Sequence, residues 1–104
     1  MHSRIVRYEY SGDAQELTQR AEDGVLPILE AQPGFRAYSL FESECEIISL
    51  STFDTREQAE AANAAIADWV AENMQDDIKL VEARFGEVLF STLLPVGTKA
   101  GTGA

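Results

Sequence analysis

The 104-residue sequence predicts an α+β domain with the element order β-α-β-β-α-β, in which a four-stranded antiparallel sheet carries two helices on one face. Three observations predict this class. Four segments alternate apolar and polar residues as strands do, two segments repeat apolar residues at helical spacing, and turn or capping residues separate the segments. The composition, 45% apolar and 25% charged, is that of a globular chain, and the length suits one domain.

The first strand and the first helix are expected at residues 4–10 and 14–31. Side chains alternate along the strand, and Asp13 is placed to cap the helix that follows. Apolar residues recur at helical spacing through the helix, with Pro27 among them. Because proline lacks a backbone donor and its ring meets the preceding turn, we expect a kink or a second short helix there. The Pro-Gly pair at 33–34 ends the helix.

A β-hairpin follows, with strands at residues 35–42 and 45–53 joined by a short acidic turn. Alternation along the first of these strands puts Phe35 and Phe41 on one face and Tyr38 on the other. The order of the elements up to this point, strand, helix, strand and strand, is the beginning of the split βαβ pattern of ferredoxin-like folds.

The second helix is expected from residue 54 to about residue 73, and the last strand from 78 to about 90. Thr55 and Gln58, or the Asp and Glu one residue earlier, have the spacing of a capping box. The helix is rich in alanine, which favours the helical state and lets the helix approach a sheet closely. A glycine inside the last strand, Gly86, predicts a bulge or a bend.

The charge and the cysteine content exclude several classes of partner. The net charge of −10 would be repelled by nucleic acid and by an anionic membrane surface, so neither is an expected partner. No stretch approaches the ~20 apolar residues of a membrane span. Cys45 is the one cysteine, so no internal disulfide forms and the expected location is the reducing cytoplasm. We expect one folded domain over residues 1–91 and a flexible tail over 92–104.

No metal or cofactor is expected from the sequence motifs. The chain has no Cys/His cluster, no calcium-loop spacing and no glycine-rich phosphate loop. Ser49 and Ser51 alternate toward one face of their strand, but the chain has no histidine near them, which excludes a Ser-His-Asp mechanism.

Both faces of the expected sheet are too apolar to meet water. The apolar residues spread over the two faces are Ile5, Tyr8, Tyr38, Leu40, Ile47, Ile48, Leu50, Phe53, Val81, Phe85, Leu89 and Phe90. A large exposed apolar sheet face usually marks an interface. We therefore expect a symmetric homodimer in which two sheets pack face to face.

The segment Pro33-Gly34-Phe35, followed by Tyr38 and by the run Leu50–Ala59, resembles the antibiotic-biosynthesis-monooxygenase-like family of the dimeric α+β barrel superfamily. The resemblance covers roughly residues 4–91. It implies a homodimer whose two sheets close into a barrel, with a pocket between sheet and helices in each subunit. One branch of the family oxygenates polycyclic aromatic substrates with dioxygen and without a metal or flavin. Other branches act on quinols or small aldehydes, or have no known activity.

The haem-degrading branch of that family resembles this chain least. It needs a ligating histidine on the second helix, and the only histidine here is His2, at a terminus that we expect to be frayed. The resemblance therefore implies that the chain works without a cofactor.

The cofactor-free branch uses an asparagine and a tryptophan on the second helix, with a tyrosine and an arginine nearby. The matching catalytic candidates in this chain are Asn63, Trp69, Tyr38 and Arg84. Asn63 and Trp69 are separated by about 240° around a helix and so flank its inner face. Asn73 would lie beside Trp69. The expected substrate-binding residues are Leu17, Phe41, Ile66, Val70 and Asn73.

Each candidate also has a purely structural interpretation. Trp69 would anchor the second helix in the core, and Asn73 would close that helix. Arg84 would pair with one of the many acids, and the tyrosines would pack in a dimer interface. The expected function is therefore a cofactor-independent monooxygenase acting on a small aromatic or quinol-like substrate. A non-catalytic homodimeric protein of the same fold, binding a small molecule or serving a structural role, is the alternative.

Overall fold

The computed structural model describes residues 1–92, and it has the predicted order of elements. These are β1 (His2–Tyr10), α1 (Ala14–Glu30), β2 (Phe35–Ser43), β3 (Glu46–Phe53), α2 (Arg56–Asn73) and β4 (Ile78–Glu87). Apart from its first residue, the tail expected over 92–104 lies outside the described residues.

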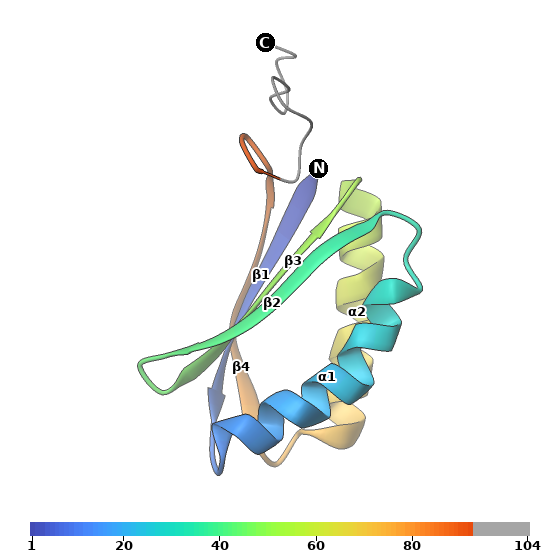
Figure 1. The fold of residues 1–104 in the computed structure, drawn as a ribbon. Helices are drawn as coiled ribbons and strands as arrows, with labels where there is room; N and C mark the ends of the chain where they lie inside the picture. Colours follow the sequence, from blue (N-terminus) through green and yellow to red (C-terminus); the bar gives the residue numbers. More distant parts are fainter. Residues whose placement is uncertain (93–104) are drawn as a thin grey trace.

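The four strands form one antiparallel sheet in the order β2-β3-β1-β4, and both helices lie on one side of it (Figure 1). This is the predicted βαββαβ architecture. The other side of the sheet, which we call the open face, carries no helix of the described residues 1–92. Residues that alternate along a strand therefore point either toward the helices or toward the open face, and this parity decides which side chains can share a site.

The first strand starts earlier than predicted. His2 pairs with Phe53 on β3 and with Glu87 on β4, so it belongs to the sheet and the expectation of a frayed terminus is wrong. The central position of β1 explains this difference, because both of its edges are hydrogen-bonded to a neighbouring strand over its whole length.

The predicted bulge at Gly86 is also wrong, because Gly86 pairs with Ser3 in regular register. The irregularity between β1 and β4 lies at Arg7 and Tyr8, whose partners are Glu82 and Leu80. A glycine permits an irregular backbone but does not impose one. A second irregularity lies on β2 between Phe35 and Ala37, opposite the end of β3.

Helix α1 is one helix through Pro27, so the second short helix does not form. Val25 and Leu29, on either side of the proline, are buried in the core and hold the last turns against the sheet. After the proline, the Ala31 N–H donates to the carbonyl of Pro27 at 3.1 Å. The burial of Val25 and Leu29 therefore offsets the free-energy cost of the one helical hydrogen bond that Pro27 cannot donate.

The capping box of α2 uses Thr55 and Gln58. The Thr55 hydroxyl accepts from the Gln58 N–H at 3.2 Å, and the Gln58 side chain accepts from the Thr55 N–H at 3.1 Å. A Cβ at Gly34 would overlap the Gln58 amide group. Gly34, just before β2, therefore leaves room for the Gln58 side chain in the cap of α2. The two residues belong to the two sequence segments that carried the family resemblance.

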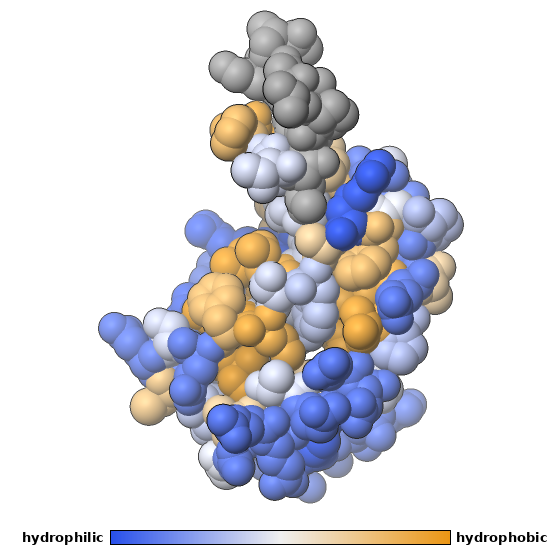
Figure 2. Space-filling view, in the orientation of Figure 1, coloured by the Kyte–Doolittle hydropathy of each residue, from blue (hydrophilic) through white to orange (hydrophobic). Residues whose placement is uncertain are grey.

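The core lies between the sheet and the two helices. Its main cluster contains Val25, Leu29, Phe53, Ala59, Ala62 and Ile66. A smaller cluster at the other end contains Leu17, Ile47 and Met74. In the space-filling view, apolar surface lies over the sheet, while the lower end, where α1 begins, is hydrophilic (Figure 2). Within residues 1–92, neither helix is long and apolar enough to cross a membrane.

Candidate ligand cavity

A narrow cavity of about 30 Å³ lies between the sheet and the two helices. Its wall is apolar apart from a few hydroxyl groups. The lining residues are Tyr8, Leu17, Thr18, Ala21, Val25, Tyr38, Leu40, Ile47, Ser49, Ile66, Val70, Met74 and Ile78. Three of the hydroxyl groups, those of Tyr8, Tyr38 and Ser49, come from the sheet. An apolar chamber with a few placed polar groups is typical of a small-molecule site.

A buried arginine lies directly behind these sheet hydroxyls. Arg4 is 1% exposed. Its Nε donates to Oδ1 of Asn63 at 2.7 Å, and its Nη1 donates to Oγ of Ser49 at 3.3 Å. Within residues 1–92, Arg4 forms no ion pair with a carboxylate. Its positive charge is therefore held by neutral oxygens alone.

The position of Arg4 follows from strand parity. Arg4, Val6 and Tyr8 alternate toward the helices, and Arg4 lies opposite Ser51 on β3. Desolvation by burial lowers the pKa of Arg4, and the nearby hydroxyls of Tyr8 and Tyr38 oppose that shift. An arginine remains charged under such a shift, because its ordinary pKa of 12.5 is so high.

Tyr38 is a largely buried phenol on the cavity wall. Burial raises the pKa of its phenol to about 12, although a hydrogen bond from Ser49 and the charge of Arg4 lower it. Tyr38 therefore stays a neutral hydroxyl at physiological pH. Ser51, which pairs with Arg4 on one side and Tyr38 on the other, has a buried hydroxyl without a hydrogen-bond partner in the described structure.

Four of the residues expected from the sequence meet at this cavity. Tyr38 contributes from β2, Leu17 from α1, and Ile66 and Val70 from α2. Phe35 packs in the core beside them although alternation alone would put it on the opposite face from Tyr38. The irregularity of β2 after Phe35 changes the parity and brings both side chains to the helix side.

The other three candidates on α2, Asn63, Trp69 and Asn73, do not line the cavity. Asn63 accepts from Arg4 and is not part of the cavity wall. Trp69 packs between the helices, with its ring over Gly24 of α1. The Nδ2 of Asn73 donates to the Trp69 carbonyl at 2.9 Å, which closes the end of the helix. These contacts agree with the structural interpretation of Trp69 and Asn73.

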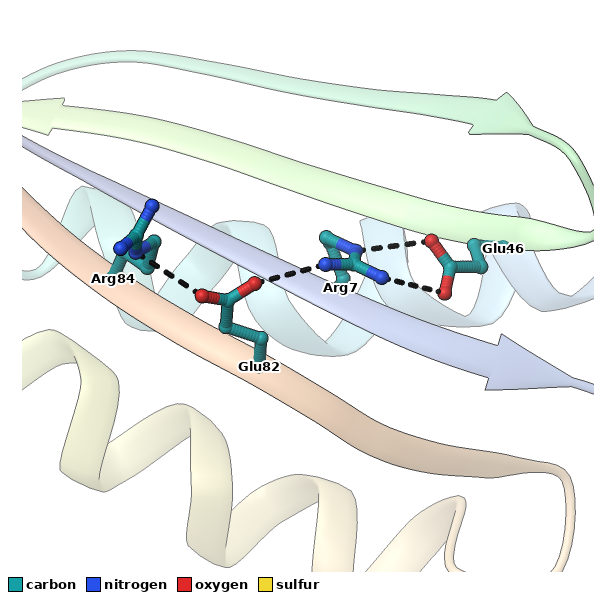
Figure 3. Close-up of polar contacts among 4 residues, drawn as sticks. All are labelled: Arg7, Glu46, Glu82 and Arg84. Carbon is teal, nitrogen blue, oxygen red and sulfur yellow. Dashed lines mark hydrogen bonds and ion pairs between the residues drawn. The ribbon is translucent and has the colours of Figure 1, made fainter.

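Arg84 and Phe41 lie on the open face or at its edge, away from the cavity wall. Phe41 pairs with Ile48, and its side chain is 46% exposed. Arg84 belongs to a row of ion pairs that crosses three strands on the open face (Figure 3). In this row Arg84 pairs with Glu82 at 3.1 Å, Glu82 with Arg7 at 2.8 Å, and Arg7 with Glu46 at 3.0 Å. Strand parity thus separates both residues from Tyr38.

The sequence reasoning missed Arg4 as a site residue. The signal was present, because Arg4 is in phase with Val6 and Tyr8 on a strand whose other residues on that face are apolar or aromatic. A charged residue at an expected core position is rare and needs partners. Within residues 1–92, no group of three or more His, Cys, Asp and Glu side chains is placed to hold a metal ion.

Comparison with solved structures identifies the fold. The cofactor-independent oxygenase SnoaB from Streptomyces nogalater matches with a TM-score of 0.68 and 13% identity, over 88% of this chain and 95% of that one. A proposed antibiotic biosynthesis monooxygenase from Nitrosomonas europaea matches with a TM-score of 0.60 and 19% identity, over 86% of this chain and 100% of that one.

A third match is NE2512, a Nitrosomonas europaea protein of unknown function, with a TM-score of 0.70 and 19% identity, over 92% of this chain and 95% of that one. No family model and no curated protein sequence matches the chain. The chain therefore has the ferredoxin-like fold of the antibiotic-biosynthesis-monooxygenase-like proteins.

Proposed function

We propose that the cavity binds a small aromatic or quinol-like molecule and that the protein oxygenates it without a cofactor. The observation that carries the proposal is the cavity itself, which is about 30 Å³ in volume and has apolar walls with sheet hydroxyls along one side. The polarity of this wall suits a ring system with one or two oxygen substituents, which would bind as the helices move apart to admit it. The fold shared with a cofactor-independent oxygenase supports the same chemistry.

In this reaction the substrate supplies the electrons. An enol or phenol loses a proton, and its anion transfers an electron to dioxygen. The two radicals combine to a peroxide on the ring carbon. For anthrone, the peroxide then loses water, so that the ring CH₂ becomes the second carbonyl of anthraquinone. One oxygen atom enters the product, and the other leaves as water with the two hydrogens. The protein has to exclude water and stabilise the anion.

One observation favours the non-catalytic alternative. Among residues 1–92, those that line the cavity include no carboxylate and no imidazole, so none of these side chains is an effective general base at neutral pH. A catalytic reaction in this cavity therefore depends on a substrate acidic enough to lose its proton to water. A binding protein has no such requirement.

The open face of the sheet supports a homodimer as part of the same proposal. Ile5 and Leu50 lie side by side in register and are each 37% exposed, and Phe41 is 46% exposed. An open groove on this face is lined by Ile5, Leu50, Leu89 and Phe90. A second copy of the chain would cover these apolar groups by packing its own sheet against them.

The test is oxidation of anthrone under isotopically labelled dioxygen, followed by mass spectrometry of the anthraquinone. We expect the protein to accelerate the reaction above the spontaneous rate in buffer and to place one labelled atom in the product. Tyr38→Phe should slow it, whereas Tyr10→Phe, which removes a hydroxyl outside the cavity wall, should not. A rate equal to that in buffer would contradict catalysis and favour the binding protein.

A further inference from the structure

The cluster behind the cavity contains many hydrogen-bond donors and few acceptors. Arg4 alone has five N–H groups, and its side chain donates to the neutral oxygens of Asn63 and Ser49, with the Tyr8 hydroxyl nearby. Ser51 adds a buried hydroxyl that has no partner within the described residues. A buried positive charge without a counterion lies in a medium where electrostatic interactions are stronger than in water. The chemical complement of such a cluster is an acceptor that carries negative charge.

Ser49 connects the guanidinium of Arg4 with the cavity wall, because it accepts a hydrogen bond from Arg4 and lines the cavity. The Oγ of Ser49 accepts from Arg4, so the proton of Ser49 is free to turn toward Tyr38, whose pKa Ser49 lowers. In that orientation the Tyr38 oxygen accepts from Ser49, and the proton of Tyr38 is directed to an acceptor outside this row. Each donor polarises the next one. Tyr38 lines the cavity, so the row Arg4–Ser49–Tyr38 ends at a hydroxyl donor facing the ligand space.

We propose that the row Arg4–Ser49–Tyr38 makes the cavity selective for an apolar ring that carries one ionised oxygen, either an enolate or phenolate or a carboxylate. Tyr38 donates to the ionised oxygen, and Arg4 acts as a positioning residue that supplies the charge through Ser49. Asn63 holds the guanidinium from the side of α2 by accepting at Nε. The inference deepens the proposed function, on whose ligand cavity it rests, but it holds for a binding protein as well as for an oxygenase.

The position of the charge explains why selectivity is expected. A neutral ligand leaves Arg4 uncompensated and gains one ordinary hydrogen bond from Tyr38. An anionic ligand gains a charge-assisted hydrogen bond and the attraction of a guanidinium in a poorly solvated environment. We expect the anion to bind roughly tenfold or more tightly than a neutral analogue of the same shape.

The experiment is isothermal titration calorimetry with two matched pairs of probes at neutral pH. The first pair is the hydroxynaphthoquinone lawsone, which is an enolate at this pH, and its neutral methyl ether. The second pair is naphthoate and naphthamide. Tighter binding of lawsone than of its ether identifies the enolate as a ligand, and tighter binding of naphthoate than of naphthamide identifies the carboxylate. Equal affinities within both pairs would overturn the inference and leave the cavity proposal intact, whereas no binding of any probe would overturn both.

Variants separate the role of the charge from a structural role. Arg4→Met should lower the affinity for the anionic probe by roughly tenfold or more and leave the affinity for the neutral probe unchanged. Arg56→Met, which removes the same charge from an exposed position on α2, should change neither. Arg4→Lys, which keeps the charge, should retain part of the preference and serves if the methionine variant does not fold. Equal weakening of both probes by Arg4→Met would show a structural role and contradict the inference.

Discussion

The packing of Trp69 against Gly24 predicts that Gly24→Ala destabilises the protein. Gly24 lies inside α1, and a Cβ built on it would overlap the Trp69 ring, with the Cη2 atom at 2.7 Å and two further ring atoms nearer still. In an exposed helix, Gly→Ala would stabilise by about 1 kcal/mol through helix propensity. Here the indole must move, and it packs against both core clusters.

Overpacking of this kind costs about 1–3 kcal/mol. The overlap involves rigid ring atoms, so we place the cost near the upper end of that range. Subtracting the propensity gain leaves a net destabilisation by Gly24→Ala of about 1–2 kcal/mol. For a domain of this size, 1 kcal/mol corresponds to a fall of about 4–8 °C in the midpoint of thermal unfolding.

Urea unfolding of the variant and its controls measures this difference. Gly86→Ala is the control, because no described atom lies within 4 Å of a Cβ at this strand position, and it should raise the stability by up to about 1 kcal/mol. In a Trp69→Leu background, Gly24→Ala should no longer destabilise. If Gly24→Ala instead stabilises the wild-type protein by the full propensity gain, Trp69 does not fill the space over Gly24, and its assignment as a helix-packing residue is wrong.

Three further predictions follow from other parts of the chain. In an alkaline absorbance titration, the difference between wild type and Tyr38→Phe should have its midpoint near pH 12, because burial raises the pKa of Tyr38 to about 12. Because the pKa of Tyr38 is higher in the folded protein than its ordinary value, the protonated phenol contributes its full share of the folding stability below pH 10, and this contribution is lost as the pH rises through 12. A midpoint near pH 10 would contradict the burial of Tyr38. Leu50→Glu on the open face should lower the solution mass from that of two chains to the 11.4 kDa of one chain. Ala64→Glu, on the exposed side of α2, should leave the mass of the dimer unchanged. A wild-type protein with the mass of one chain would contradict the dimer. The hairpin turn has positive φ at Glu44 and Cys45 (51° and 66°), so replacing them with Asn-Gly should raise the unfolding free energy by about 1–2 kcal/mol, and an unchanged thermal midpoint would show that the turn is not strained.

The order of the elements was predictable because each one carries its own local signal. The alternation in β1, the capping box at Thr55 and Gln58 and the Pro-Gly stop after α1 each depend on neighbouring residues alone. The structure confirms these features within a few residues of the expected bounds.

The positions of the irregularities could not be predicted, because they depend on pairing between strands. The shift after Phe35 changes which β2 side chains face the helices, and no turn residue marks it in the sequence. The glycine that suggested a bulge, Gly86, lies in a regular part of the ladder. Local propensity therefore identified the strands but not their register.

The candidate site was predictable where the helices line it and only in part on the sheet, where Tyr38 lines the cavity and Phe41 does not. Leu17, Ile66 and Val70 follow from helical periodicity and do line the cavity. The role of Arg4 depends on Asn63 and Ser49, which are 59 and 45 residues away in sequence. A contact between residues so far apart in sequence is a property of the tertiary structure. In the sequence, only the charged residue at an expected core position indicates it.

A methyl nuclear magnetic resonance titration of the protein with lawsone shows directly whether the ligand binds in the cavity. A ligand between the sheet and the helices should cause the largest shifts at the methyl groups of Leu17, Ile66 and Val70. Methyl groups of Ile5 and Leu50, on the open face, should change little. Shifts confined to the open face, or no saturable shift at all, would contradict the assignment of the cavity as the ligand site.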